Sequence, residues 1–283
     1  MSANESIIEG VRPVAAAHQQ PGPRLAALRG WLRAATGLVV PAVLAALWEL
    51  AASFGWIPAK LLPPPSAVID TIRALVASGD LWTHMLATLH RVAVGFGLGV
   101  VVATILGAVT GYASCVRRLL DPTIQGLRNI PSIAWVPLFI LWFGIFETSK
   151  VLLIAVGAFF PVYLGLSSGI RDVDRKLVEV GRIYDLSAWA LIRRILLPAA
   201  LPAYVVGLRS GLGLAWMFVV AAEMMGASEG LGYLLVDGQM TSRPDVIIAS
   251  IVMFAVLGKA TDAILVRLGA GVLSWQDSFK PQG

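Results

Sequence analysis

Ionisable residues inside long apolar runs are the first candidates for chemistry in this sequence. Arg209 and Glu223 lie in one such run, and Lys259 and Asp262 lie three residues apart in another. A charge at the centre of an apolar membrane helix costs about 2.5–3.5 kcal/mol, so each group needs a partner, a water path or an interface. A guanidinium binds oxyanions well, which makes Arg209 a candidate contact for a small anion. The alternative for Arg209, Glu223 and Glu49 is snorkelling to an interface. We expect Lys259 and Asp262 to form a neutralising intrahelical pair, with a proton or ion relay as the alternative.

No group of residues typical of an enzyme accompanies these charges. His18, His84 and His90 are scattered along the sequence, and the single cysteine, Cys115, cannot form an intrachain disulfide or complete a usual Cys/His zinc site. The only Gly-Lys dipeptide begins at Gly258 and is followed by alanine in an apolar run, so it is not a phosphate-binding loop. We therefore expect no catalytic, metal-binding or cofactor-binding residues, and any energy from ATP must come from a partner protein.

The composition indicates which elements must hold these residues. Of the 283 residues, 57% are hydrophobic and only 14% are charged, whereas a soluble domain has about 25% charged residues. The 22 lysines and arginines give a net charge of +5, but they occur in short bursts between apolar runs, unlike the continuous basic patch of a nucleic-acid-binding protein. We expect an all-α polytopic membrane protein that binds no nucleic acid.

Six runs approach the roughly 20 apolar residues that a membrane helix needs. They cover residues 36–54, 92–113, 131–146, 151–170, 203–226 and 246–266. With the N-terminus inside, fifteen lysines and arginines lie in the inner segments and four in the outer ones, a clear positive-inside asymmetry. The sequence thus predicts six transmembrane helices with cytoplasmic segments 1–35 and 269–283 at the two termini. The outer segment 55–91 contains a proline cluster at 63–65 and then a short amphipathic stretch.

The inner segment 171–202 is the longest charged stretch between two spans. Val173, Leu177, Val180 and Tyr184 recur at helical spacing opposite a charged face, which predicts a short amphipathic helix. Residues 185 and 186 interrupt it, and Ser187 is a plausible N-cap of a second helix. The segment is therefore either a solvated connector or a docking surface for another protein.

This segment resembles the EAA loop of ABC importer permeases. The family pattern is Glu-Ala-Ala, three residues, Gly, nine residues, Ile, one residue and Leu-Pro. Glu179, Ile195, Leu197 and Pro198 match the pattern in register, Val180 and Gly181 take the two alanine positions, and Asp185 replaces the glycine. Asp tolerates left-handed backbone geometry better than most residues, so the turn is compatible with this change. The resemblance implies that these residues, together with Leu191, couple the chain to an ATPase.

The resemblance covers most of the chain and narrows to the permeases for aliphatic sulfonates, taurine and nitrate. Among these it is strongest to the aliphatic sulfonate permeases, notably in LRNIPSIAWVPL and PVYLGLSSGIRDVDRKLVEVGR. It implies the transmembrane domain of a type I ABC importer, over residues 84–268, in a bacterial inner membrane. It also implies a homodimer with two cytoplasmic ABC ATPases, which would bind the ATP and Mg²⁺, and a periplasmic or lipid-anchored solute-binding protein. Aliphatic sulfonates are the expected substrates, with taurine or nitrate as the alternative.

Four residues are candidates for the translocation pathway: Arg209, Trp216, Met217 and Glu223. For Trp216 the alternative is core packing or an interfacial position. Glycines spaced by four, in the pairs beginning at Gly95, Gly107 and Gly207, predict close helix packing.

Two other classes of protein remain as alternatives. A polytopic membrane enzyme would need a cluster of carboxylates or histidines at one membrane face, and a secondary transporter would be expected to have broken helices in matching halves. The sequence shows neither feature.

Overall fold

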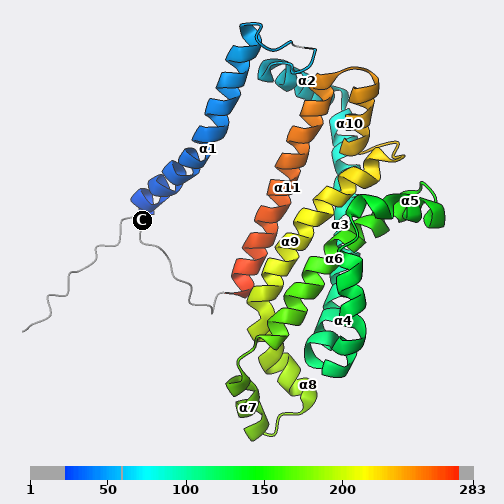
Figure 1. Cartoon of the computed structure of the whole chain (residues 1–283). Coiled ribbons are helices and arrows are strands. Elements are labelled where there is room, and N and C mark those ends of the chain that lie inside the picture. Colours follow the sequence, from blue (N-terminus) through cyan, green and yellow to red (C-terminus); the bar gives the residue numbers. More distant parts are fainter. Residues whose placement is uncertain (1–22, 59, 274–283) are drawn as a thin grey trace, which may run out of the picture. The chain divides into compact units, whose positions relative to one another are not determined.

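The computed structural model describes residues 23–58 and 60–273, and its regular elements in those residues are all helices (Figure 1). Residues 1–22 of the expected N-terminal segment and 274–283 of the expected C-terminal tail lie outside the described residues. The chain divides into the units Met1–Trp56 and Ile57–Gly283. The first contains α1 (Pro23–Ser53), which begins before the predicted start of the first span at residue 36.

Three long helices form the core of the second unit: α3 (Asp80–Tyr112), α6 (Glu147–Arg171) and α9 (Leu197–Met224). The central helix is α6, in which Ile154, Ala158, Val162 and Tyr163 are fully buried. An apolar helix that is covered on several sides becomes the packing centre of a bundle.

Glycines set the distance between these three helices. A Cβ added at Gly99 of α3 would lie 2.5 Å from the carbonyl oxygen of Ala155, and one at Gly207 of α9 would lie 2.9 Å from that of Pro161. The other glycines of the three predicted pairs also face α6. The predicted close helix packing is therefore confirmed, and it occurs within this chain.

Four helical stretches of the described residues are long and apolar enough to cross a membrane: α3, α6, residues 188–224 ending in α9, and α11 (Pro244–Val272). The first predicted span lies within the 31-residue helix α1 and includes its apolar stretch Val39–Ser53. The third corresponds to a shorter apolar helix, Ala134–Phe143 within α5 (Ser132–Phe143). At about 1.5 Å per residue, the 12 residues of α5 extend roughly 18 Å, less than the hydrocarbon thickness of about 30 Å.

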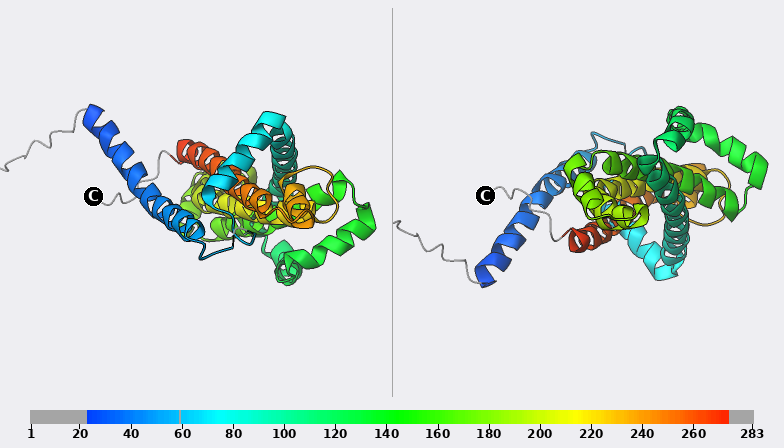
Figure 2. Two further views of the ribbon diagram at one scale, coloured as in Figure 1. Left: turned by 90° about the horizontal axis from the view of Figure 1, so that it is seen from above. Right: turned by 90° about the horizontal axis from the view of Figure 1, so that it is seen from below.

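The third predicted span is present only as α5, and the helix before it lies in a stretch that the sequence assigned to an inner loop. This helix, α4 (Ser114–Arg128), turns back along α6: Ile124 packs beside Tyr163, whose hydroxyl donates to Asp121 Oδ1 at 3.1 Å. Pro131 separates α4 from α5, because proline lacks a backbone N–H and disfavours a helical residue before it. Figures 1 and 2 show α4 and α5 together at one side of the bundle.

The two ends of the bundle carry different short helices (Figure 1). At one end, α2 (Pro65–Ser78) and α10 (Leu231–Met240) pack on α11, and Thr71 donates to Asp245 Oδ2 at 2.7 Å. At the other end lie α7 (Arg175–Ile183), α8 (Ala188–Leu191) and a π-helical turn, η1 (Ile192–Leu196), which leads directly into α9. Helix α2 matches the amphipathic stretch expected in the outer segment.

Candidate functional site

The segment 171–202 folds as a helix, a turn and a second helix, as the sequence predicts. Asp174 caps α7 by accepting from the Lys176 N–H at 2.9 Å, and Ser187 caps α8 by accepting from the Ala190 N–H at 3.3 Å. Each side chain satisfies a backbone donor that has no partner inside its helix. These caps fix the starts of the two helices. We call residues 174–196, which contain both helices and the turn between them, the hairpin.

The turn of the hairpin depends on Asp185, which has a φ of 51°. Its N–H donates to the Arg182 carbonyl, and the Leu186 N–H donates to the Gly181 carbonyl at 3.1 Å, which closes the end of α7. The left-handed conformation that aspartate tolerates is therefore the one it adopts here, in the position where the EAA pattern has glycine.

Gly181 allows the two arms of the hairpin to meet. A Cβ at this position would lie 2.6 Å from Leu191 Cδ1 and 2.7 Å from Ile195 Cδ1. Leu191 is buried, and the π-turn that contains Ile195 passes into α9 at Leu197 and Pro198. A displacement of α7 would therefore act on the start of a long core helix.

The hairpin leaves an apolar surface uncovered. It consists of Leu177, Val180 and Ile183 on α7, Tyr184 at its C-cap and Trp189 on α8, all of them exposed, with Ile183 at 78%. Glu179 is on the same helix and pairs with Arg175 at 2.9 Å. An apolar patch ringed by charges typically marks a protein interface, and we call these five residues the docking surface.

At the other end of the bundle lies a buried charge cluster that sequence reasoning missed. Arg91 of α3 is 1% exposed, and its guanidinium binds Glu223 of α9 at 2.7 Å and both carboxylate oxygens of Glu147 of α6, at 2.7 and 2.9 Å. It also donates to the Glu229 carbonyl at 2.6 Å. The sequence signal was an arginine directly before the run 92–113 and a glutamate within the run 203–226, because a charge at such a position needs a partner.

Glu223 also fixes the start of α10. Its carboxylate accepts from the Gly232 N–H at 2.8 Å and from the Thr88 hydroxyl at 2.9 Å, while the Thr88 oxygen accepts from the Leu231 N–H at 2.8 Å. A carboxylate at a helix N-terminus satisfies free N–H groups and interacts favourably with the helix dipole. The cluster joins α3, α6, α9 and α10, and its donors are taken up by protein acceptors, so it is a clamp and has no open position for chemistry.

The interface-snorkelling interpretation of Glu223 is therefore wrong. Glu223 is 1% exposed, because a guanidinium, a hydroxyl and a backbone N–H of the protein solvate its carboxylate in place of water.

The predicted intrahelical pair of Lys259 with Asp262 is present at 4.0 Å, but Asp262 has a nearer partner that the sequence did not indicate. Its carboxylate binds Arg209 of α9 through two hydrogen bonds of 3.0 and 3.2 Å, whereas Lys259 lies 4.0 Å away on the same helix. The planar guanidinium fits a carboxylate through two donors, which a lysine three residues away cannot do. The role of Arg209 in a pathway remains a prediction.

The last two pathway candidates have different surroundings. Trp216 is 9% exposed and its Nε1 donates to Thr261 of α11 at 2.9 Å, which corresponds to the core-packing alternative. Met217 is 61% exposed and lines a groove between the α4–α5 break, α6 and α9.

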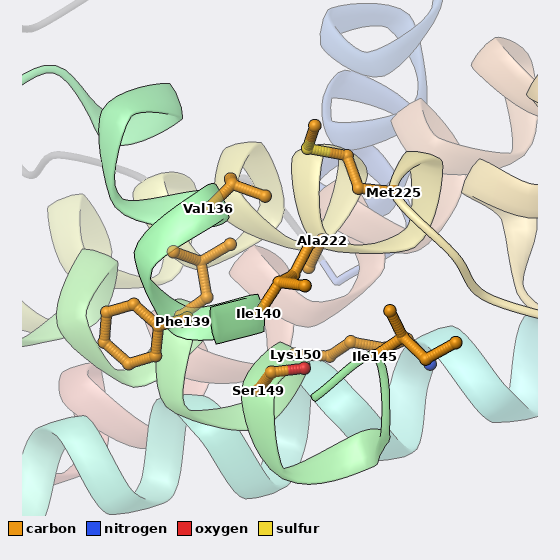
Figure 3. A pocket seen from close by; sticks show the side chains of 9 residues that line it. Val136, Phe139, Ile140, Ile145, Ser149, Lys150, Ala222 and Met225 are labelled. Atoms are coloured by element: carbon orange, nitrogen blue, oxygen red, sulfur yellow. The ribbon is translucent and has the colours of Figure 1, made fainter. Parts of the chain in front are cut away.

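Two hollows lie along this side of the bundle. Figure 3 shows the smaller, between α5, α6 and α9, where Ser149 and Lys150 are the polar side chains. Its free volume of about 10 Å³ has room for one water molecule at most. The groove beside Met217 has about 420 Å³, within the roughly 300–1,000 Å³ typical of small-molecule sites.

The family is shown by comparison with known proteins. Residues 95–273 match the family model described as binding-protein-dependent transport system inner membrane component. The chain therefore belongs to this family of ABC importer permeases, whose members are translocation pore subunits and not enzymes, and which act with ATPase and solute-binding partners.

Several individual transport permeases are also similar to this chain. The chain is 42% identical to the putative aliphatic sulfonates transport permease protein SsuC of Bacillus subtilis, over 89% of this chain and 90% of that protein. It is 39% identical to the protein of the same description from Escherichia coli, and 33% identical to the E. coli taurine transport system permease protein TauC over 82% of this chain and 84% of that protein. A chain of the inward-facing MetNI methionine ABC transporter has the same fold, with a TM-score of 0.61 at 19% identity over 68% of this chain and 97% of that one.

Proposed function

We propose that this chain is the transmembrane subunit of a bacterial inner-membrane importer for aliphatic sulfonates. Two copies form the pathway, both termini are cytoplasmic, and the chain itself binds no cofactor. The relatives with the highest identities quoted above are described as aliphatic sulfonate permeases. Taurine is the second candidate substrate, since TauC is also a relative, and nitrate is the third.

The observation that carries the coupling part of the proposal is the docking surface. Tyr184 and Trp189 are 76% and 69% exposed at the end of a hairpin that continues into α9. A cytoplasmic ATPase that covers this surface would bury its apolar area, and closure of an ATPase dimer would move both hairpins together. Glu179 and the other residues of the EAA pattern then serve as the coupling element.

A single substitution on the docking surface tests this proposal. In the complex with ATPase and binding protein, we expect Ile183→Asp to reduce sulfonate uptake and ATPase co-purification strongly, because it places a charge in an apolar interface. Leu61→Asp is the matched control, since Leu61 is 75% exposed in the loop before α2. Normal uptake and a full complement of ATPase in Ile183→Asp would refute the coupling role. Glu179→Lys, which leaves the hairpin packing intact, should also uncouple transport.

The substrate is tested by uptake into proteoliposomes. Aliphatic sulfonates, taurine and nitrate are each supplied with the binding protein, and stimulated ATP hydrolysis is measured beside uptake. Uptake of taurine or nitrate but of no alkanesulfonate would contradict the proposed substrate while leaving the importer assignment in place.

A further inference from the structure

The groove beside Met217 lies at the middle of the bundle. Its walls are Gly157, Phe160, Pro161 and Leu164 of α6 and Leu214, Met217 and Phe218 of α9. Helix α6 runs from residue 147 to residue 171, so these positions are close to its midpoint. The break between α4 and α5 brings residues 128–131 to the same depth, because α4 runs back along α6 from Asp121 beside Tyr163.

The chemistry of the groove is asymmetric. Arg128 and Asn129 form one part of its lining, and most of the rest is apolar, with the aromatic side chains of Trp135, Phe160 and Phe218. No carboxylate of the described residues pairs with Arg128, and none lines the groove. By contrast, Arg91 and Arg209 are both neutralised by protein carboxylates.

We propose that this groove is a binding site within the permease for a monoanion with an apolar tail. The anionic head binds Arg128 and Asn129, and the tail lies along Trp135, Phe160 and Met217. A guanidinium binds a sulfonate through two donors, and the apolar wall removes the alkyl chain from water. The inference rests on the proposed function and goes further, since it assigns substrate selection to the pore subunit as well as to the separate binding protein.

The lining also predicts the order of preference among the candidate substrates. The ammonium group of taurine finds no carboxylate in the groove, and nitrate has no tail to contact the aromatic wall. Alkanesulfonates of several carbons satisfy both parts of the site, and each methylene placed on the apolar wall strengthens binding by up to about fourfold.

Direct binding tests the site independently of transport. The permease with its ATPase, in lipid nanodiscs and without the binding protein, is titrated calorimetrically with hexanesulfonate, methanesulfonate and taurine. We expect saturable binding of hexanesulfonate that weakens roughly tenfold or more in Arg128→Gln, as loss of hydrogen bonds to a charged group implies. Arg73→Gln is the control, because Arg73 lies on the surface of α2 and should bind as wild type does.

A second variant examines the apolar part of the groove. Met217→Trp fills it, so the affinity for hexanesulfonate should fall while the weak affinity for methanesulfonate changes little. Absence of saturable binding in the wild type, equal affinity in Arg128→Gln, or equal binding of taurine and hexanesulfonate would each overturn the proposal, as would a cross-link showing that a second copy fills the groove. Binding in nanodiscs combined with no sulfonate uptake in proteoliposomes would instead contradict the proposed function alone.

Discussion

Arg91 and Glu223 are 132 residues apart in the sequence, and their side chains form an ion pair of 2.7 Å with 2% and 0% exposure. A buried ion pair is tolerated only when further hydrogen bonds satisfy both groups. Glu147, Thr88 and the Gly232 N–H provide these bonds. The pair therefore ties the start of α3 to the end of α9 at the opposite end of the bundle from the hairpin.

Breaking this pair should destabilise the protein strongly. Arg91→Leu leaves Glu223 buried and without its cationic partner, and we expect a loss of about 3–5 kcal/mol in the free energy of unfolding. The measurement is the melting temperature of the purified permease in mild detergent. Asp262→Asn removes a partly exposed pair and should cost less than about 1 kcal/mol. If the two variants melted at the same temperature, the clamp would not be a major source of stability.

The contact between α3 and α6 should be sensitive to one methyl group. In Gly99→Ala the new Cβ lies 2.5 Å from the Ala155 carbonyl oxygen, a backbone atom that cannot move without shifting α6. Overpacking of this kind costs about 1–3 kcal/mol. Gly97→Ala is on the same helix with nothing within 4 Å of its new Cβ, and it should be neutral or slightly stabilising. The measurement is the melting temperature of Gly99→Ala beside that of Gly97→Ala. Equal melting temperatures would refute the close contact between α3 and α6.

The turn at Asp185 should accept glycine and reject a β-branched residue. Asp185→Gly removes the cost of a positive φ and should keep both stability and coupled ATP hydrolysis. Asp185→Val should lose about 1–2 kcal/mol. Asp172→Val provides the comparison, because Asp172 is exposed with a φ of −82°. A fully stable Asp185→Val protein would show that the turn has another geometry.

The tight approach inside the hairpin predicts a size limit at Gly181. The atoms that an added Cβ would meet are the flexible ends of Leu191 and Ile195, so Gly181→Ala should retain transport. Gly181→Phe should separate α7 from α8 and uncouple ATP hydrolysis from uptake. Arg182→Phe tests bulk alone at the adjacent exposed position. Equal coupling ratios in Gly181→Phe and Arg182→Phe would contradict the packing described here.

The sequence alone determined the features that depend on local pattern. Continuous apolar runs specified the helices α3, α6, α9 and α11, because a helix satisfies its own backbone in lipid. Asp185 and Ser187 predicted the turn and the N-cap of the hairpin, because the turn preference of aspartate and the capping preference of serine act within a few residues. The match of Glu179 and Pro198 to the EAA pattern indicated the family for a similar reason, since the whole pattern lies within one short stretch of the chain.

Only the tertiary structure decided which distant residues meet. Nothing within 20 residues of Arg91 indicates that Glu223 neutralises it. The spacing of Lys259 and Asp262 predicted their pair, but not the shorter contacts of Asp262 with the Arg209 guanidinium of another helix. The return of α4 along α6 depends on contacts such as Tyr163 with Asp121, and it moves Arg128 from an expected loop into the groove. Pairings of this kind follow from how the helices pack against one another, and they cannot be predicted from the spacing of residues along the chain.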